Sequence, residues 1–581
     1  MALSGGAEPA GPAGPRVEAP SGDEQPTVGA VDRPVQAAPR RRLPGWALLS
    51  GLVALLVVGP LLALPASLIG GPTVFDAIAR ALLPEALRNS VVLALGVGAG
   101  TLVIGGGLAF LVSFYDFPGR RWLDWALVLP MAMPGYVLVF VLLGQYDLAN
   151  PLQSNLFGGG LQVPGLRTTG GAVVVLTAVL YPYVYVLGRS AFLGQSRQSI
   201  EAARGLGRTY GQAVRQVAVP LARPALAAGV ALAVMEALAD FGTVDLLGVR
   251  ALTSTIYRVW NGTFDQDAAL QLATVLITLA LALVSIERLL RGRARYHQAL
   301  SRGDAVVPVR LTGWRGVLAA APGTLLLVLV FFLPVAQLVA WSIESLADGT
   351  FGSELVSATV TTLLLGGVTA VVAVGTGTLI VYGQRAQPSR LGGLLARMTT
   401  VGYAVPGTVV AVAVYAPLVW MDRRLDDVAD SVFGRGIGLV ITGSILGLVL
   451  AYLVRFQALA YFAVEARMGA ISPNLDEAAR ALGADRTRVL ADVHLPLLWP
   501  GVLTAGLLVL VEVMKELPAT ALLRPLGVDT LAITVWEATK DSRLDTAALP
   551  ALLIVLVGLL PVIVLVRLLR RDGWTSVAER L

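Results

Sequence analysis

Long apolar runs recur along the whole 581-residue chain and leave little room for any architecture other than membrane-spanning helices. A helix needs about 20 apolar residues to cross the ~30 Å hydrocarbon core of a bilayer. Charged residues make up only 14% of the chain, whereas ordinary soluble proteins hold about 25%. The runs are continuous rather than alternating, which argues against a transmembrane β-barrel. The sequence therefore predicts an all-α polytopic membrane protein.

About twelve membrane spans are expected, and their order is consistent with the charges of the loops. They lie near 46–66, 89–114, 123–146, 171–193, 223–246, 268–290, 316–341, 357–383, 397–420, 437–463, 501–523 and 546–570. Arginines such as Arg204, Arg208 and Arg480 occupy alternate loops, whereas an opposite loop contains Asp422 and Asp426. Since cytoplasmic loops carry the excess of positive charge, both termini are expected in the cytoplasm. The net charge of +6 is assigned to these loops rather than to nucleic-acid binding.

The chain also repeats internally. Pro134-Gly135 in the third span corresponds to Pro406-Gly407 in the ninth, and Glu236 in the fifth corresponds to Glu512 in the eleventh. Each half therefore contains six spans, and because six is even, both halves have the same orientation. This predicts two parallel six-helix repeats related by an axis along the membrane normal, with any pathway on that axis.

The predicted domains follow from this repeat. They are a disordered cytoplasmic tail (1–39), a first six-helix unit (40–290), a basic cytoplasmic linker (291–315), a second six-helix unit (316–571) and a cytoplasmic C-terminal tail (572–581). The tail is rich in Pro, Gly and Ala, a composition that does not support a packed core.

One polar motif occurs twice, once in each half of the chain, with identical internal spacing. The copies are Glu201, Ala202, Ala203, Gly207, Pro220 and Pro224, and Glu477, Ala478, Ala479, Gly483, Pro496 and Pro500. Each copy predicts a short helix with a smooth alanine face, a glycine that ends the helix, and a return into the membrane at the prolines. In the second copy we expect Asn474 as N-cap and Glu477 as its capping-box partner.

A well-capped cytoplasmic loop would explain one copy of this motif, but two copies at equivalent places indicate a function. The pattern resembles the EAA loop of ABC importer permeases of the binding-protein-dependent type. The resemblance implies the type I ABC importer permease fold, with two fused permease units in the bacterial plasma (inner) membrane. It also implies that both loops are coupling helices for a cytoplasmic ATPase dimer, and that an extracytoplasmic solute-binding protein delivers the substrate.

Nucleotide chemistry is not expected on this chain. It contains no Gly-x-x-x-x-Gly-Lys-Ser/Thr, and its only lysines are Lys515 and Lys540, so ATP is expected on the partner subunit. Cysteine is absent and the only histidines are His297 and His494, which argues against a thiolate or multi-histidine metal site. Both histidines are expected to be solvated in cytoplasmic loops, and the chain is predicted not to be an enzyme.

Two further stretches concern the substrate. Residues 515–532, with Lys515-Glu516-Leu517-Pro518-Ala519-Thr520 at their start, resemble ferric-iron permeases. So does the stretch 239–260, which begins Ala239-Asp240-Phe241-Gly242-Thr243-Val244. Ferric iron is therefore the expected substrate. The alternatives are thiamine, a polyamine or a phosphonate, or a twelve-span secondary transporter that needs no ATPase.

Charged residues at membrane depth are the candidates for a translocation path. They are Glu236, Asp240, Glu512, Lys515 and Glu516. Such residues usually face a polar cavity or a partner, and a hard ferric ion prefers oxygen ligands. Two interpretations remain open, an acidic lining on the two-fold axis or structural ion pairs such as Lys515 with Glu512. Tyr181, Tyr183 and Tyr185 are further oxygen donors on the fourth span, and no metal site is assigned.

Overall fold

A computed structural model of the chain describes residues 45–68, 80–146, 165–195, 197–263, 265–291, 308–349 and 352–574. The chain divides into two units, Met1–Leu43 and Pro44–Leu581. The tail predicted for 1–39 lies outside the described residues, as do His297, most of the predicted linker and the end of the chain beyond Trp574. All elements below belong to the second unit.

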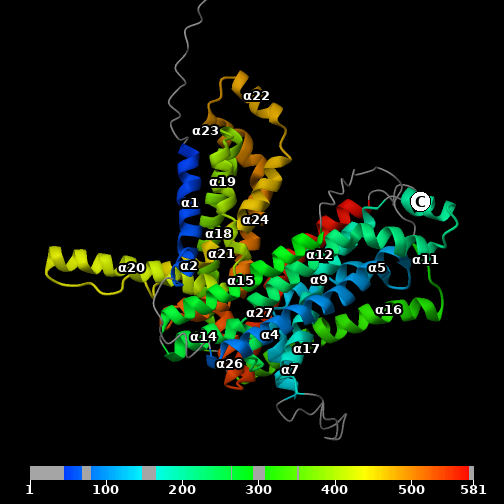
Figure 1. Ribbon diagram of the computed structural model, residues 1–581, viewed down its shortest axis with the longest axis horizontal. Coiled ribbons are helices and arrows are strands. Elements are labelled where there is room, and N and C mark those ends of the chain that lie inside the picture. Colours follow the sequence, from blue (N-terminus) through cyan, green and yellow to red (C-terminus); the bar gives the residue numbers. More distant parts are fainter. Residues whose placement is uncertain are drawn as a thin grey trace, which may run out of the picture. The chain divides into compact units, whose positions relative to one another are not determined.

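In the residues that the structure describes, the first half of this unit is helical apart from one short strand (Figure 1). In chain order its elements are α1 (Gly45–Leu61), α2 (Ala63–Ala66), α4 (Leu83–Thr101), η1 (Leu102–Gly106), α5 (Gly107–Phe114), β1 (Tyr115–Asp116), α6 (Arg120–Ala126), η2 (Leu129–Ala132), α7 (Gly135–Tyr146), α9 (Thr169–Leu193), α10 (Arg197–Gly205), α11 (Tyr210–Ala213), η3 (Val214–Ala218), α12 (Val219–Ala239), α13 (Gly242–Leu246), α14 (Leu252–Thr263) and α15 (Gln266–Arg291).

The second half begins with a second short strand and is otherwise helical over the part of it that the structure describes. They are β2 (Val309–Arg310), α16 (Trp314–Leu327), η4 (Val328–Phe332), α17 (Leu333–Ala347), α18 (Ser353–Ala386), α19 (Arg390–Met398), η5 (Val401–Ala404), α20 (Gly407–Phe433), α21 (Ile445–Gly469), α22 (Pro473–Ala481), α23 (Arg486–Arg488), η6 (Val489–His494), α24 (Leu495–Lys515), α25 (Pro518–Leu523), α26 (Leu531–Lys540) and α27 (Leu544–Trp574). The alignment that places Glu201 on Glu477 extends to the helices, since it also superposes α9 on α21 and α12 on α24, residue for residue.

Ten helices in the described ranges are long and apolar enough to cross a membrane, and two bent helix pairs raise the number to twelve. The prediction of an all-α membrane protein with about twelve spans is therefore confirmed. Many apolar side chains on these helices are exposed in the isolated chain, for example Val371 (74%) and Leu95 (63%), as expected for surfaces that contact lipid.

The third and ninth predicted spans are not straight helices. The segments Arg120–Ala132 and Gly135–Gln145 meet at 88°, and Arg390–Ala404 and Gly407–Phe433 meet at 119°. Both breaks fall at the Pro-Gly pairs that the sequence repeats, where proline removes a helical hydrogen bond and glycine tolerates close contacts.

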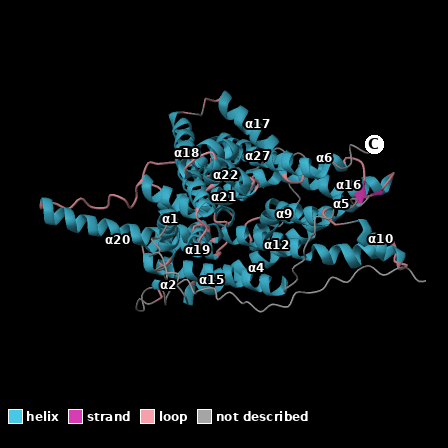
Figure 2. Ribbon diagram, turned by 90° about the horizontal axis from the view of Figure 1, so that it is seen from above, coloured by secondary structure: helices cyan, strands magenta, loops and turns pink. Residues whose placement is uncertain are grey.

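The acidic segment after the ninth span was predicted as a loop, but its first part is helical. Helix α20 continues to Phe433 and extends away from its neighbours in both views (Figures 1 and 2). Asp422 lies on this helix and accepts hydrogen bonds from the backbone N–H groups of Val440 (3.1 Å), Ile441 (2.8 Å) and Thr442 (2.6 Å). These bonds fold the following segment back along α20, and the next span begins only at Ile445.

The first helix of each half packs against the other half. Helix α1 contacts α18, α19, α20 and α21, and the Trp46 ring lies edge-on to Tyr382 of α18 with centroids 5.4 Å apart. Helices α16 and α17 contact α6 and α7 of the first half in return. Strands β1 and β2 pair in parallel, with Tyr115 opposite Val309 and Asp116 opposite Arg310. The two halves are therefore interlocked through their ends.

Candidate functional site

The two copies of the repeated motif adopt the same local structure. Helices α10 and α22 each end shortly before a glycine in the left-handed region, Gly207 (φ 85°) and Gly483 (φ 86°). The Gly207 N–H donates to Arg204 O at 2.9 Å, and the Gly483 N–H donates to Arg480 O at 3.0 Å. The predicted helix ends at these glycines are therefore confirmed. Glycine suits this place because a residue with a side chain would be strained at that φ.

The cap of the second motif helix differs from the prediction. Ser472 is the N-cap of α22, and its hydroxyl accepts a hydrogen bond from the Asn474 N–H at 3.3 Å. Asn474 lies inside the first turn instead, because Pro473 at the first helical position needs no N–H partner and starts the helix earlier than expected.

An exposed leucine stands at the tip of each motif, next to the alanine face. Ala202 and Ala478 are exposed, and Ala203 and Ala479 are half-buried. The side chains of Leu206 and Leu482 are 85% and 88% exposed. These leucines were missed by the sequence reasoning, although each directly precedes the motif glycine and they occupy equivalent positions in the two copies. A large exposed apolar side chain beside small residues is typical of a surface that another protein covers.

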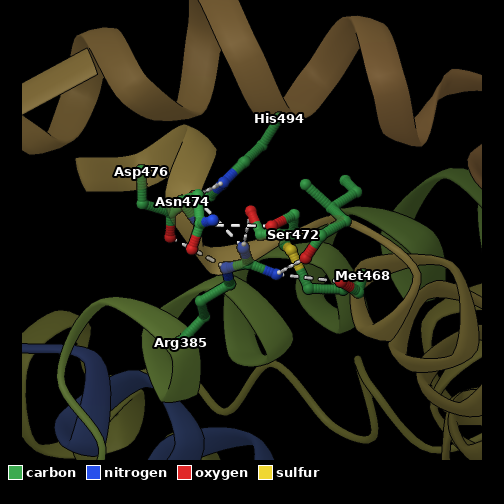
Figure 3. Close-up of polar contacts among 7 residues, drawn as sticks. Arg385, Met468, Ser472, Asn474, Asp476 and His494 are labelled. Carbon is green, nitrogen blue, oxygen red and sulfur yellow. Dashed lines mark hydrogen bonds and ion pairs between the residues drawn. The ribbon is translucent and has the colours of Figure 1, made fainter. Parts of the chain in front are cut away.

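Behind α22 lies a buried polar cluster, the Asp476 node, which consists of Arg385, Asp476 and His494 (Figure 3). The Arg385 guanidinium donates to both carboxylate oxygens of Asp476, at 2.8 and 3.1 Å. The Nε2 atom of His494 lies 2.8 Å from Asp476 Oδ1. His494 is fully buried, so its prediction as a solvated loop residue was wrong; Tyr382 covers its ring, with centroids 5.5 Å apart.

Asp476 is ionised at neutral pH. Burial on its own would raise the pKa of this carboxyl, but the hydrogen bonds from Arg385 and His494 outweigh burial and lower the pKa below its ordinary value of 3.8. The node therefore contains a charged carboxylate held by two nitrogen donors.

The predicted path residues meet at a cavity of about 130 Å³ between the two halves. Pro134 and Gly135 of the first bend line it, and Gly407 of the second bend lies against Arg455 and Glu516 of the lining. Its charged lining consists of Glu236 and Asp240 from the first half with Glu512, Lys515, Glu516 and Arg455 from the second. The sequence reasoning missed Arg455, although a lone arginine in the apolar span 437–463 was a signal for it. Four acidic and two basic side chains give this lining a formal charge of −2.

Asp240 and Glu516 play the same structural part in each half. The Asp240 carboxylate accepts hydrogen bonds from the Thr243 N–H (2.8 Å) and hydroxyl (3.0 Å), and Glu516 accepts one from the Ala519 N–H (2.9 Å). Each carboxylate thereby connects the end of a long helix to the short helix that follows. Glu516 also faces Arg455, with Nη1 and Oε2 2.8 Å apart.

Both interpretations of the intramembrane charges are represented in this lining. Lys515 Nζ lies 2.7 Å from Glu512 Oε1, as the ion-pair interpretation expected. Glu236 lines the cavity and forms no ion pair with the other described residues. Of the three tyrosines on α9 only Tyr183 lines the cavity, because Tyr181 donates to Leu127 O and Tyr185 to Asp124 O. Among the described residues no three Asp, Glu or His side chains are arranged to hold a metal ion.

Comparison with known proteins identifies the class of this protein. The model of the family "Binding-protein-dependent transport system inner membrane component" matches residues 101–295 and 373–572. The two matches cover more than half of the chain, which therefore belongs to this family and carries its unit twice. It is an ABC importer permease made of two fused units.

Individual relatives differ in the substrate that their names state. The Fe(3+)-transport system permease protein FbpB 2 of Haemophilus influenzae is 26% identical over 536 residues, which are 90% of this chain and 98% of that protein. A probable molybdenum ABC transporter permease of Haloferax volcanii is 32% identical over 201 residues, 34% of this chain and 72% of its own. The sulfate permease CysT of Salmonella typhimurium is 28% identical over 268 residues, 44% of this chain and 95% of its own.

Proposed function

We propose that this chain is the membrane permease of an ATP-driven importer for ferric iron. The substrate is inferred from the charge of the cavity between the halves, since four carboxylates face two basic groups there. Carboxylates suit a hard cation such as Fe³⁺ by their oxygen ligands as well as by their charge. One relative that matches nearly the whole chain is also named for Fe(3+) transport.

The same charge disfavours an oxyanion such as sulfate. An anion in this cavity would face a net negative lining inside the membrane, where water screens charges poorly. Since no cluster of three acidic or histidine ligands is formed among the described residues, the lining suits passage of a cation better than its retention. A path must bind its ion weakly enough to release it.

Energy and substrate delivery are assigned to partners. Helices α10 and α22, with Leu206 and Leu482 at their tips, are proposed to dock on a cytoplasmic ATPase dimer, one helix for each subunit. This chain has no phosphate-binding loop of its own, so the ATP belongs to that dimer. A solute-binding protein is proposed to deliver iron from the outer side of a bacterial inner membrane, with both termini of this chain in the cytoplasm.

Reconstitution tests the substrate. Proteoliposomes that contain this chain, its ATPase and its solute-binding protein should take up radioactive iron(III) only when ATP is present. The double change Glu236→Gln and Glu512→Gln removes two negative charges from the cavity and should lower uptake about tenfold or more, which corresponds to ~1.4 kcal/mol. Glu354→Gln is the matched control, because Glu354 is exposed in the first turn of α18.

Three outcomes would contradict the proposal. Uptake of sulfate or thiamine without iron would reject the substrate. Iron uptake driven by an ion gradient without ATP would indicate a secondary transporter. Full uptake by the double variant would show that the carboxylates of Glu236 and Glu512 do not contribute to the translocation path.

A further inference from the structure

We propose that Asp476 is a positioning residue that fixes the second coupling helix α22 to α24, and that the equivalent position of the first coupling helix is held by apolar packing instead. The inference rests on the proposed role of α10 and α22 as coupling helices. It starts from a difference between two segments that otherwise share their spacing, their helix ends and their exposed leucines.

The Asp476 node joins four elements of the second half. Arg385 comes from the end of α18, Asp476 from α22, and His494 from the turn of π-helix η6 that leads into α24. Arg385 also donates to three backbone carbonyls, that of Met468 at the end of α21 (2.9 Å) and those of Ile471 (2.9 Å) and Ser472 (3.1 Å) in the turn that leads into α22. Charge-assisted hydrogen bonds in a buried place are stronger than neutral ones, so these elements are tied firmly together.

The corresponding positions of the first half hold no charge. When the two motifs are aligned on their glutamates, Ile200 takes the place of Asp476 and Ala218 takes the place of His494. Ile200 is buried in the apolar core, 3% exposed, so α10 is seated by apolar packing. At the position equivalent to His494, the Ala218 carbonyl oxygen accepts a neutral hydrogen bond from the Gln195 amide at 2.9 Å. Apolar packing is not directional, so Ile200 gives α10 no counterpart of the directional bonds that Asp476 gives α22.

Helix α24 connects the node with the cavity. His494 directly precedes this 21-residue helix, which is about 31 Å long at 1.5 Å per residue. Glu512 and Lys515 lie at its other end, and Glu516 follows it. A displacement of α22 by its partner would thus reach the cavity carboxylates along one continuous helix.

A purely structural role for the node is the competing explanation. In that case the only role of the cluster would be to let Arg385 fix the backbone between α21 and α22. Asp476→Asn separates the two roles, because it leaves Arg385 and its three backbone bonds in place and removes only the negative charge on α22 to which Arg385 and His494 bind.

The test uses the full-length protein with its ATPase and solute-binding protein. Amide hydrogen exchange should become about tenfold faster in 473–483 of Asp476→Asn, as expected for loss of a buried charge-assisted bond, and should be unchanged in 200–207. The number of ATP molecules hydrolysed per iron ion taken up should rise several-fold. Asp476→Glu and His494→Gln each keep a hydrogen bond in the node and should restore part of the coupling, whereas His494→Ala should not. Asp430→Asn, on exposed α20, is the matched control.

The outcomes separate this inference from the proposed function. Unchanged hydrogen exchange in 473–483 would show that Asp476 does not fix α22. Faster exchange with an unchanged ratio of ATP to iron would show that the node is structural only. If the unaltered chain fails to bind an ATPase at all, the proposed function itself fails.

Discussion

Gly135 and Gly407 occupy equivalent positions where a side chain would collide with a polar group that binds a cavity carboxylate. A Cβ atom on Gly135 would lie 2.3 Å from the Thr243 hydroxyl that binds Asp240. A Cβ on Gly407 would lie 2.2 Å from Arg455 Nη1 and 2.6 Å from Glu516 Oε1. The two Pro-Gly bends thus bring the backbone against the cavity carboxylates, and each glycine is required by a contact rather than by its backbone angle.

Gly407→Ala should therefore destabilise the protein by about 1–3 kcal/mol, the usual cost of overpacking a filled interior. Thermal unfolding in detergent would measure this as a lower Tm. Gly375→Ala is the matched control, since a Cβ there has no atom within 4 Å, and in α18 alanine is the better helix former. Equal Tm values for the two variants would contradict the close contact at Gly407.

The residues around this cavity also show where sequence reasoning reached its limit. Glu236, Asp240, Glu512 and Glu516 were predictable, because a charge in an apolar span is a local signal. The burial of His494 was not, because Tyr382 and Asp476, which cover and bind its ring, belong to other elements. Arg455 is likewise a charge in an apolar span and could have been predicted. Its pairing with Glu516 could not, because that contact depends on the packing of α21 beside α24 and α25.

Helices were the part of the fold that the sequence predicted best. An apolar run of sufficient length is a property of the run itself, so the spans could be located without knowledge of their neighbours. The sharp bends at Pro134 and Pro406 could not be oriented from the sequence, since proline marks a break but the contacts of Gly135 and Gly407 decide its direction. Helix α20 was mistaken for a loop beyond the membrane because its acidic residues ended the apolar run.

The short helices α10 and α22 carry a prediction about the leucines at their tips. Leu206→Ala and Leu482→Ala should each weaken binding of the ATPase subunit about tenfold, as is usual for an anchor residue that a partner buries. Because both side chains are exposed, the Tm of the permease should change little. Co-purification and equilibrium binding to the ATPase measure the effect.

Leu526→Ala provides the control, since this leucine is fully exposed on the loop between α25 and α26. Normal ATPase binding by a variant that lacks both Leu206 and Leu482 would contradict the docking role. Bulky residues in place of Ala202 and Ala203, or of Ala478 and Ala479, should block binding by occupying the same face, with membrane insertion unchanged.

At the scale of the whole molecule, the two fused units are not independent bodies. Helix α1 is packed by α18 to α21, and α16 and α17 are packed in part by the first half. The buried apolar residues form two clusters that follow the same exchange. One cluster joins α1 and α15 to the second half, and the other joins α17 and α27 to the first half. The internal repeat was visible in the sequence, but this exchange of end helices was not, since hydropathy carries no information on which helices become neighbours.

The exchange has a consequence for biosynthesis. Helix α1 leaves the ribosome well before α18, its first packing partner in the second half, which begins only at Ser353. At roughly 5–20 residues per second, α1 waits about 15–60 seconds in the bilayer before its partners exist. During that interval its future packing face is covered by lipid, or by whatever assists insertion, and the first half completes its fold only after most of the second half has been synthesised.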